Sequence, residues 1–321
     1  MLSTLVGRSL RAAATVSPAL AGRLALRAFF TTAPRLPVRD DDAVTHHAAR
    51  RSWLLARGRE LAVHEWGTGD RVVLVLHGWR GRASQLAPLV RELVAEGFRV
   101  VSFDAPAHGS SPDGPADIRD WVAAAEGLHR AHGPFDAIVG HSLGGLAALT
   151  AARSTVPTGR VAVVAGVGRP DPFLTEFTRT LGLDDATRTH LERAFHARVG
   201  ESRESAAERY DAVAHPLPAG TELLVVHDRD DRRMPDHDAV RLHDAHAGRS
   251  RLVRTAGLGH TRLLSSDVAL DALTAFATGG LAAVDALDAG QEARQVREPG
   301  PDPVCTTPGD DRRVAAGTTG R

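Results

Sequence analysis

Short apolar runs rich in β-branched residues alternate with helical patterns through the middle of the chain. Because these runs show no polar alternation, they are typical of strands buried on both faces. The runs are residues 71–76, 99–103, 137–139, 161–165 and 223–226. After the first run, apolar residues recur at helical spacing from Leu86 to Val94, and Gly97 follows as a C-cap. The alternation predicts an α/β domain over residues 52–278, a mostly parallel central sheet with helices on both faces.

Residues 171–214 interrupt this alternation. The segment has no strand-like run, but Phe173, Phe177, Leu191 and Phe195 fall at helical spacing in two groups. We expect a small helical cap, inserted before the strand at 223–226 and lying over the carboxyl ends of the sheet, where α/β proteins bind ligands. Its large side chains indicate a pocket for an apolar group of modest size. The alternative that these helices only extend the core stays open.

The two ends differ from the middle in composition. Residues 1–39 hold six arginines and no acid. For residues 1–51 we expect a basic arm, partly helical or disordered, with a helix around Leu20, Leu24 and Phe29 that packs on the body; a cleaved targeting segment and weak peripheral membrane association stay open. Residues 279–321 are rich in Gly, Pro, Asp and Thr and are predicted to be a disordered tail.

Charge and composition exclude several functions. The chain of 321 residues balances 39 basic against 39 acidic residues, and has nine Phe, four Trp and one Tyr, which disfavours a nucleic-acid binder. No run is apolar and long enough to predict an integral membrane span, so we expect a cytoplasmic protein. The single Cys305 excludes an intramolecular disulfide. His243 and His246 lack a third ligand, so we expect no metal and no cofactor.

One motif carries chemistry. Gly140-His141-Ser142-Leu143-Gly144 stands between the strand-like run at 137–139 and a helical pattern. A serine at such a tight turn projects its hydroxyl, and Gly140 and Gly144 leave room for the close approach of the two elements. The N-terminus of the following helix suits a developing oxyanion. The context predicts Ser142 as a nucleophile.

A serine nucleophile needs a base, and the base needs an orienting acid. His260 lies in a glycine-flanked loop after a strand-like segment at 252–254, which predicts it as the base. For the acid, Asp228, Asp230 and Asp231 all follow the run at 223–226. Spacing alone leaves the three acids open.

The order Ser142, acid, His260, each in its own context, resembles the α/β-hydrolase superfamily, of the serine esterase and lipase type, over about residues 60–278. Related sequences carry H-G-x-x-D-x-x-V-P after this strand, which implies Asp231 as the acid and Asp230 as the fallback. Here Asp228 stands where glycine is usual. Leu76-His77-Gly78-Trp79 is similar to the family's oxyanion loop, which implies that the backbone N–H groups of Trp79 and Leu143 bind the oxyanion.

The resemblance implies a serine hydrolase that cleaves a carboxylic ester or thioester of a small-molecule acyl substrate through an acyl-enzyme on Ser142. Two alternatives stay open. An acyltransferase would use the same triad with an alcohol or amine acceptor, and a non-catalytic binding protein could keep the triad by descent. The sequence leaves the acyl chain length and the oligomeric state undetermined.

Overall fold

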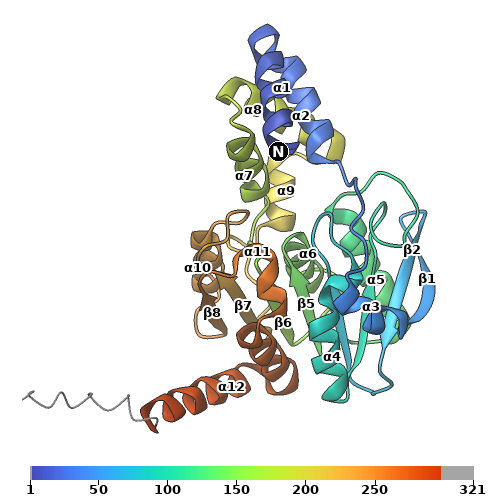
Figure 1. Cartoon of the computed structure of the whole chain (residues 1–321), viewed down its shortest axis with the longest axis vertical. Helices are drawn as coiled ribbons and strands as arrows, with labels where there is room; N and C mark the ends of the chain where they lie inside the picture. The colour runs from blue at the N-terminus through green and yellow to red at the C-terminus, as the bar shows by residue number, and fades with distance from the viewer. Residues whose placement is uncertain (1, 298–321) are drawn as a thin grey trace, which may run out of the picture.

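Eight strands form one twisted sheet at the centre of the molecule (Figure 1). The computed structural model describes residues 2–297. The spatial order is β1-β2-β4-β3-β5-β6-β7-β8. The strands are β1 (Arg50–Ala56), β2 (Arg59–Trp66), β3 (Val72–Leu76), β4 (Arg99–Phe103), β5 (Ala137–His141), β6 (Arg160–Val164), β7 (Glu222–Asp228) and β8 (Ser250–Thr255). From β4 to β8 neighbouring strands are parallel, and β1 and β2 add an antiparallel edge. The predicted fold class is confirmed.

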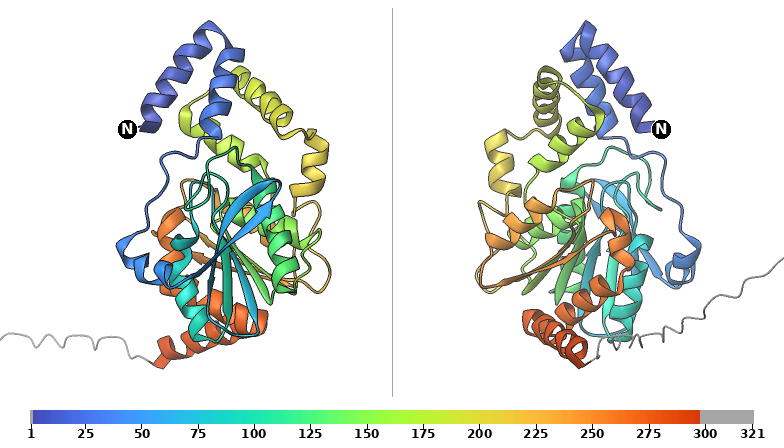
Figure 2. Two further views of the ribbon diagram at one scale, coloured as in Figure 1. Left: turned by 90° about the vertical axis from the view of Figure 1, so that its right-hand side faces the viewer. Right: turned by 60° about the vertical axis from the view of Figure 1, so that its left-hand side comes forward.

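Helices cover both faces of this sheet (Figure 2). On one face lie α5 (Ile118–His132), α6 (Leu143–Ala152) and α10 (Asp236–Asp244), and on the other lie α4 (Ala87–Ala95) and α12 (Asp267–Arg297). Helix α6 is buried on all sides after its first residue, which explains why its sequence is apolar all round. The short elements η1 (Ala83–Leu86), α3 (Asp40–His47), α11 (Gly259–Arg262) and η2 (Leu263–Ser265) connect or flank these layers.

A separate helical lobe stands over the carboxyl ends of the parallel strands (Figure 1). It contains α7 (Asp171–Leu181) and α8 (Asp185–Val199), with α9 (Arg203–Tyr210) leading back to the body. The N-terminal helices α1 (Leu2–Val16) and α2 (Pro18–Phe29) complete the lobe, with α2 against α8 and α1 against α7. Their apolar side chains form a core of their own around Leu10, Ala25, Leu174 and Leu191. The arm is therefore structurally part of the cap.

The predicted boundary at 278 and the disordered tail from 279 are wrong for residues 279–297. Helix α12 continues to Arg297, with a non-helical Gly280 (φ 70°) inside it, and Leu281 and Val284 beyond this kink are buried. The glycine pair at 279–280 hides a helical spacing that runs from Ala277 through Leu281 to Val284. The predicted start at 52 is also late, because β1 begins at Arg50. Residues 298–321 lie outside the described residues.

Helix α12 also bears on the expectation of no membrane span. Within residues 2–297, one stretch, Asp267–Ala289, is long and apolar enough to cross a bilayer, with a mean hydropathy of 1.3. Leu273, Phe276 and Ala277 on this stretch are buried in the apolar core beneath the sheet. The apolar composition therefore matches what a core helix needs.

Cutting the chain after Thr278 should destabilise it relative to a chain cut after Arg297. The shorter chain loses Leu281 and Val284 from the core, and each buried aliphatic side chain contributes about 2 kcal/mol. We expect the free energy of unfolding, measured with urea, to fall by about 4 kcal/mol. Equal unfolding midpoints for the two chains would contradict the buried position of this segment.

Candidate active site

Ser142 occupies the turn between β5 and α6 in a backbone conformation that L-residues rarely adopt, with φ 54° and ψ −119°. Its N–H donates to the carbonyl oxygen of Val164 at 2.9 Å, which fixes the turn to β6. A Cβ at Gly140 would lie 2.2 Å from the carbonyl oxygen of Gly144, and one at Gly144 would lie 2.4 Å from that of Leu76. Only glycine fits at these two positions, so the turn holds Ser142 at the start of α6.

His260 lies on α11, just after β8, and is bonded to the acid that the family resemblance implied. Its Nδ1 lies 2.7 Å from Oδ2 of Asp231. Since a carboxylate only accepts, Nδ1 carries the proton and Nε2 is the nitrogen left for another partner. Oδ1 of Asp231 accepts the backbone N–H groups of Arg233 at 2.8 Å and Met234 at 3.1 Å. Both Asp231 and His260 are almost fully buried at the side chain.

The pKa of Asp231 reflects two opposed effects. Burial raises this pKa. The hydrogen bond and charge of His260, together with the N–H groups of Arg233 and Met234, lower it by more than burial raises it. The net result is a pKa below the ordinary value for aspartate. The carboxylate therefore stays ionised beside His260 at neutral pH.

The other two acids after β7 hold the loop that carries His260. Asp228 Oδ2 accepts from the hydroxyl of Thr255 at 2.7 Å and from the N–H of Leu258 at 3.0 Å. Oδ2 of Asp230 accepts the N–H of Gly257 at 2.8 Å. The fallback Asp230 thus contacts the backbone of this loop, whereas Asp231 contacts the imidazole. Asp228 is the last residue of β7, whereas its partners lie farther along the chain, Thr255 at the end of β8 and Leu258 just before α11.

His141, inside the serine motif, is a further contact that sequence reasoning missed. Its Nε2 donates to the backbone carbonyl oxygen of His260 at 3.0 Å, and the two rings lie 4.8 Å apart. Burial, and then the proximity of His260, lower the pKa of His141 to about 3. His141 is therefore neutral at ordinary pH and can hold His260 in place without adding charge.

The loop after β3 brings Gly78 and Trp79 beside Ser142. A Cβ at Gly78 would lie 2.9 Å from Cβ of Ser142, so the loop and the serine are in close approach. Among the described residues, neither the N–H of Trp79 nor that of Leu143 donates to a protein acceptor. These two donors, one on the loop and one at the first turn of α6, are free to bind an anion next to Ser142.

His108 supports that loop from the segment after β4. Arg80, next to Trp79, has φ 58°, and its N–H donates to Nε2 of His108 at 2.9 Å. Nδ1 of His108 donates to the carbonyl oxygen of Pro106 at 2.8 Å. Burial lowers the pKa of His108 to about 3, which keeps the ring neutral and Nε2 free to accept. His108 is a turn residue, as its sequence context predicts, and it also positions the loop.

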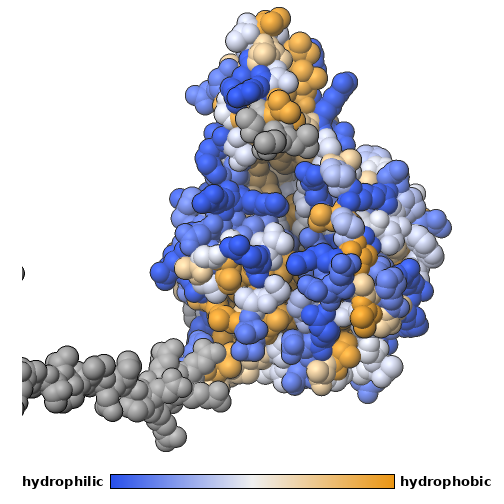
Figure 3. Space-filling model, in the orientation of Figure 1, coloured by the Kyte–Doolittle hydropathy of each residue, from blue (hydrophilic) through white to orange (hydrophobic). Residues whose placement is uncertain are grey.

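A cavity of about 580 Å³ joins these elements beneath the cap. Ser142, His260 and Trp79 lie at its floor side, and most of its lining is apolar. The space-filling view shows the hollow between the helical lobe and the body, with apolar side chains in it (Figure 3). The apolar and aromatic side chains of the cap and the arm that line the cavity are Phe29, Phe30, Pro34, Leu36, Pro37, Phe173, Leu174, Phe177, Phe195, Val199, Ala206 and Tyr210.

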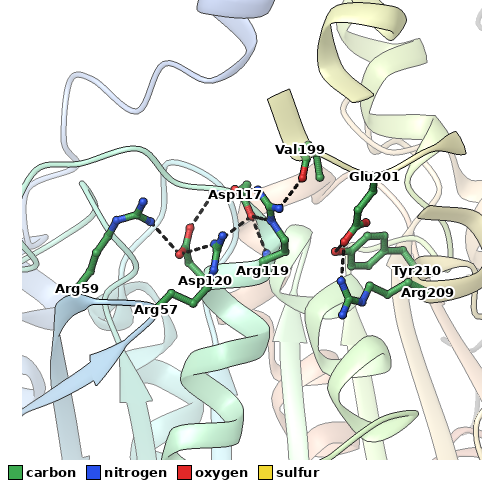
Figure 4. Close-up of polar contacts among 9 residues, drawn as sticks. All are labelled: Arg57, Arg59, Asp117, Arg119, Asp120, Val199, Glu201, Arg209 and Tyr210. Carbon is green, nitrogen blue, oxygen red and sulfur yellow. Dashed lines mark hydrogen bonds and ion pairs between the residues drawn. The ribbon is translucent and has the colours of Figure 1, made fainter. Parts of the chain in front are cut away.

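Polar contacts fasten the cap to the body at one side of this cavity (Figure 4). Arg119 on α5 pairs with Asp117 at 2.8 Å and donates to the carbonyl oxygen of Val199 at the end of α8. Between α8 and α9, Glu201 accepts from Arg209 and, at 3.4 Å, from the hydroxyl of Tyr210. Burial is the main reason that the pKa of Tyr210 rises to about 12. Arg119 thus joins the body to the end of α8, and Glu201 joins the end of α8 to α9.

No group of three or more metal-ligating side chains occurs in the part of the chain that the structure describes. Both ring nitrogens of His246, which was considered with His243 as a metal ligand, have hydrogen-bond partners. Nδ1 donates to the carbonyl oxygen of Leu242, and Nε2 accepts a hydrogen bond from the N–H of Leu217. His246 therefore has no nitrogen available for a metal.

A mostly parallel sheet with a serine at a strained strand-to-helix turn, and an aspartate–histidine pair on the loops after β7 and β8, defines the α/β-hydrolase class. The chain belongs to the alpha/beta hydrolase family, whose model matches residues 72–277.

Similar proteins include esterases. Pimeloyl-[acyl-carrier protein] methyl ester esterase from Xanthomonas campestris pv. campestris is 34% identical over 214 residues, which cover 60% of this chain and 81% of that enzyme. A nonribosomal peptide synthetase of Aspergillus flavus, agiA, is 34% identical over 133 residues; they cover 38% of this chain, which thus spans only 2% of that protein.

Solved structures share the fold at low identity. Alpha/beta hydrolase domain-containing protein 10 from mouse aligns with a TM-score of 0.57 and 18% identity, covering 76% of this chain and all of that one. A thioesterase domain from the curacin biosynthetic pathway aligns with a TM-score of 0.52 and 15% identity, covering 72% of this chain and 99% of that one.

Replacing Asp228 by alanine should cost more stability than replacing Asp230. The first change leaves the half-buried N–H of Leu258 and the half-buried Thr255 hydroxyl without their acceptor, for about 2 kcal/mol in the free energy of unfolding. Asp230 is exposed, so water can replace its bond to Gly257 and the loss should stay within about 0.5 kcal/mol. Urea unfolding of both variants checks this, and equal losses would contradict it.

Acid should begin to destabilise the protein below about pH 6.5, which is the ordinary pKa of histidine. The pKa of His141 is about 3 when folded, so between pH 6.5 and 3 the unfolded chain binds a proton that the folded chain does not. Each pH unit in this window then removes about 1.4 kcal/mol per such histidine. Replacing His141 by asparagine should reduce the slope of unfolding free energy against pH by about that amount. An unchanged slope would show that His141 titrates normally.

Proposed function

We propose that the protein is a serine hydrolase that cleaves a carboxylic ester or thioester through an acyl-enzyme on Ser142. The observation that carries this proposal is the 2.7 Å bond between Asp231 and Nδ1 of His260, made beside the same apolar cavity that Ser142 enters from a strained turn. A base with one nitrogen held by a buried carboxylate has a single nitrogen to offer, which is what activation of a serine requires.

In the first half of the reaction, Nε2 of His260 takes the proton of the Ser142 hydroxyl as its Oγ attacks the acyl carbon. The carbonyl oxygen becomes an oxyanion and is bound by the N–H groups of Trp79 and Leu143; each such donor contributes about 3 kcal/mol to transition-state stabilisation. His260 then gives the proton to the leaving alcohol or thiol, and Asp231 stabilises the charged imidazole in between.

In the second half, His260 takes a proton from water as the water oxygen attacks the acyl carbon. The bond from this carbon to Oγ of Ser142 then breaks, His260 returns the proton to Oγ, and the carboxylic acid leaves. The apolar lining of the cavity supports an acyl substrate, because it can bury a hydrocarbon chain next to the reacting carbonyl. The relative from Xanthomonas campestris acts on a methyl ester, and the curacin relative is a thioesterase domain, which supports the same bond classes here.

Replacing Ser142 by alanine should abolish turnover of a nitrophenyl ester and covalent labelling by a fluorophosphonate, because both need Oγ. Asp231→Asn should lower kcat by about ten-thousandfold, since an amide favours the wrong imidazole tautomer. The matched variant Asp230→Asn, whose side chain contacts the loop backbone and not His260, should lose less than tenfold.

The measurements are steady-state hydrolysis and labelling at one pH for the wild type and all three variants. A wild-type protein that shows neither turnover nor labelling would overturn the proposal. Turnover that survives Ser142→Ala would exclude this serine as the nucleophile.

A further inference from the structure

The N-terminal arm forms a wall of the cavity that neither helices α7 to α9 nor the sheet supplies. Phe29 ends α2, and the chain from Phe30 to Pro37 then descends from the lobe to the body. Phe29, Phe30, Pro34, Leu36 and Pro37 all line the cavity. The arm, far from Ser142 in sequence, thus faces the same space as Ser142.

The two phenylalanines join an aromatic cluster with the cap. Phe29 packs edge-on against Phe177 at 5.1 Å and Phe195 at 5.8 Å between ring centroids. Phe30 stacks on Phe195 at 5.8 Å with 15° between the planes, and the guanidinium of Arg198 covers it at 4.2 Å. Both phenylalanines are half-buried, so part of each ring remains free to meet a ligand.

The arm also contacts the loop that carries the oxyanion donor. Phe30 packs edge-on against Trp79 at 6.2 Å, and the indole N–H of Trp79 donates to the carbonyl oxygen of Thr31 at 3.4 Å. Further down, Arg82 donates to the carbonyl oxygen of Leu36 at 2.9 Å. Since the arm is bonded to the body at several points, it is a fixed wall of the site.

The chemistry of this wall identifies what it can bind. Residues 1–39 contain no acid, and the arginines of α2, Arg23 and Arg27, are exposed on its outer side. Apart from Arg35, the side chains that the arm presents to the cavity are aromatic or aliphatic. Such a surface binds hydrocarbon, and a cavity of about 580 Å³ falls within the range of about 300–1,000 Å³ that holds ligands far larger than an acetyl group.

We propose that Phe29 and Phe30 bind the distal part of the acyl chain, so that the arm makes the enzyme selective for medium and long unbranched acyl groups over acetyl. This inference rests on the proposed function. Every methylene that the arm and cap remove from water should raise kcat/KM by about fourfold, until the chain fills the cavity.

The test compares p-nitrophenyl acetate with p-nitrophenyl decanoate. In the wild type, kcat/KM should be at least tenfold higher for the decanoate. The double variant Phe29→Ala/Phe30→Ala should lower the decanoate-to-acetate ratio of kcat/KM by at least tenfold, and Phe30→Leu, which keeps an apolar side chain, should lower it by less. Leu20→Ala, on the outer side of the same helix, should leave the ratio within twofold. If the decanoate-to-acetate ratio of kcat/KM in the double variant stays within threefold of the wild-type ratio, the inference is overturned.

A binding measurement separates this inference from the proposed function. Decanoic acid is titrated calorimetrically into Ser142→Ala protein with and without the two phenylalanine changes. We expect at least tenfold weaker binding without the phenylalanines. If wild-type protein hydrolyses no ester but this loss is seen, the proposed function fails and the arm is still the chain-binding wall. If decanoic acid binds equally with and without the phenylalanines, the arm has no such role, whatever the activity. Circular dichroism of each variant, matched to Leu20→Ala, identifies loss of binding that comes from unfolding of the lobe.

Discussion

The backbone of Ser142 is the constraint on which the arrangement of the site depends. A non-glycine residue at φ 54° costs about 1–3 kcal/mol, and the surrounding fold must hold it there. It does so by packing Gly140 against Gly144 and by bonding the Ser142 N–H to β6. Because this turn joins the central strand β5 to the buried helix α6, Ser142 is held between two buried elements. The loops after β3, β7 and β8 bring the other residues of the site to the position that this turn gives Ser142.

Around Ser142, neutral histidines form directional hydrogen bonds without adding charge. Burial lowers the pKa of His77, His108 and His141, so each presents one N–H donor and one nitrogen acceptor in fixed places. His108 accepts from the loop beside Trp79, and His141 donates to the backbone of His260. The ionised group in contact with His260 is Asp231. A positive charge on His260 is therefore stabilised by the Asp231 carboxylate and is not opposed by the neutral ring of His141.

The sequence allowed prediction of the parallel strands and of the turns that carry Ser142 and His260, because these depend on local patterns. Asp231 followed only from the resemblance to the α/β-hydrolase superfamily, since spacing left three acids open. Buried parallel strands are continuous apolar runs, and the serine turn has its own glycine spacing. The antiparallel edge strands were missed because β1 is mostly exposed and β2 carries Glu60, His64 and Glu65 among its apolar residues. The extension of α12 was missed because a glycine pair usually ends a helix, whereas here Gly280 only bends it. Contacts such as Asp228 with Leu258, or Phe29 with Phe177, join segments far apart, and no local pattern records them.

The position of the arm has a consequence for how the lobe is held together. Helices α1 and α2 pack on α7 and α8, although strands β1 to β6 all lie between the two pairs in the sequence. These contacts close a long loop, whose entropic cost grows only slowly with its length. Because the helical lobe has an apolar core of its own, it is a local unit that can loosen while the eight strands stay paired. Thr31 and Leu36, which are hydrogen-bonded to Trp79 and Arg82, tether the arm to the body when the lobe loosens.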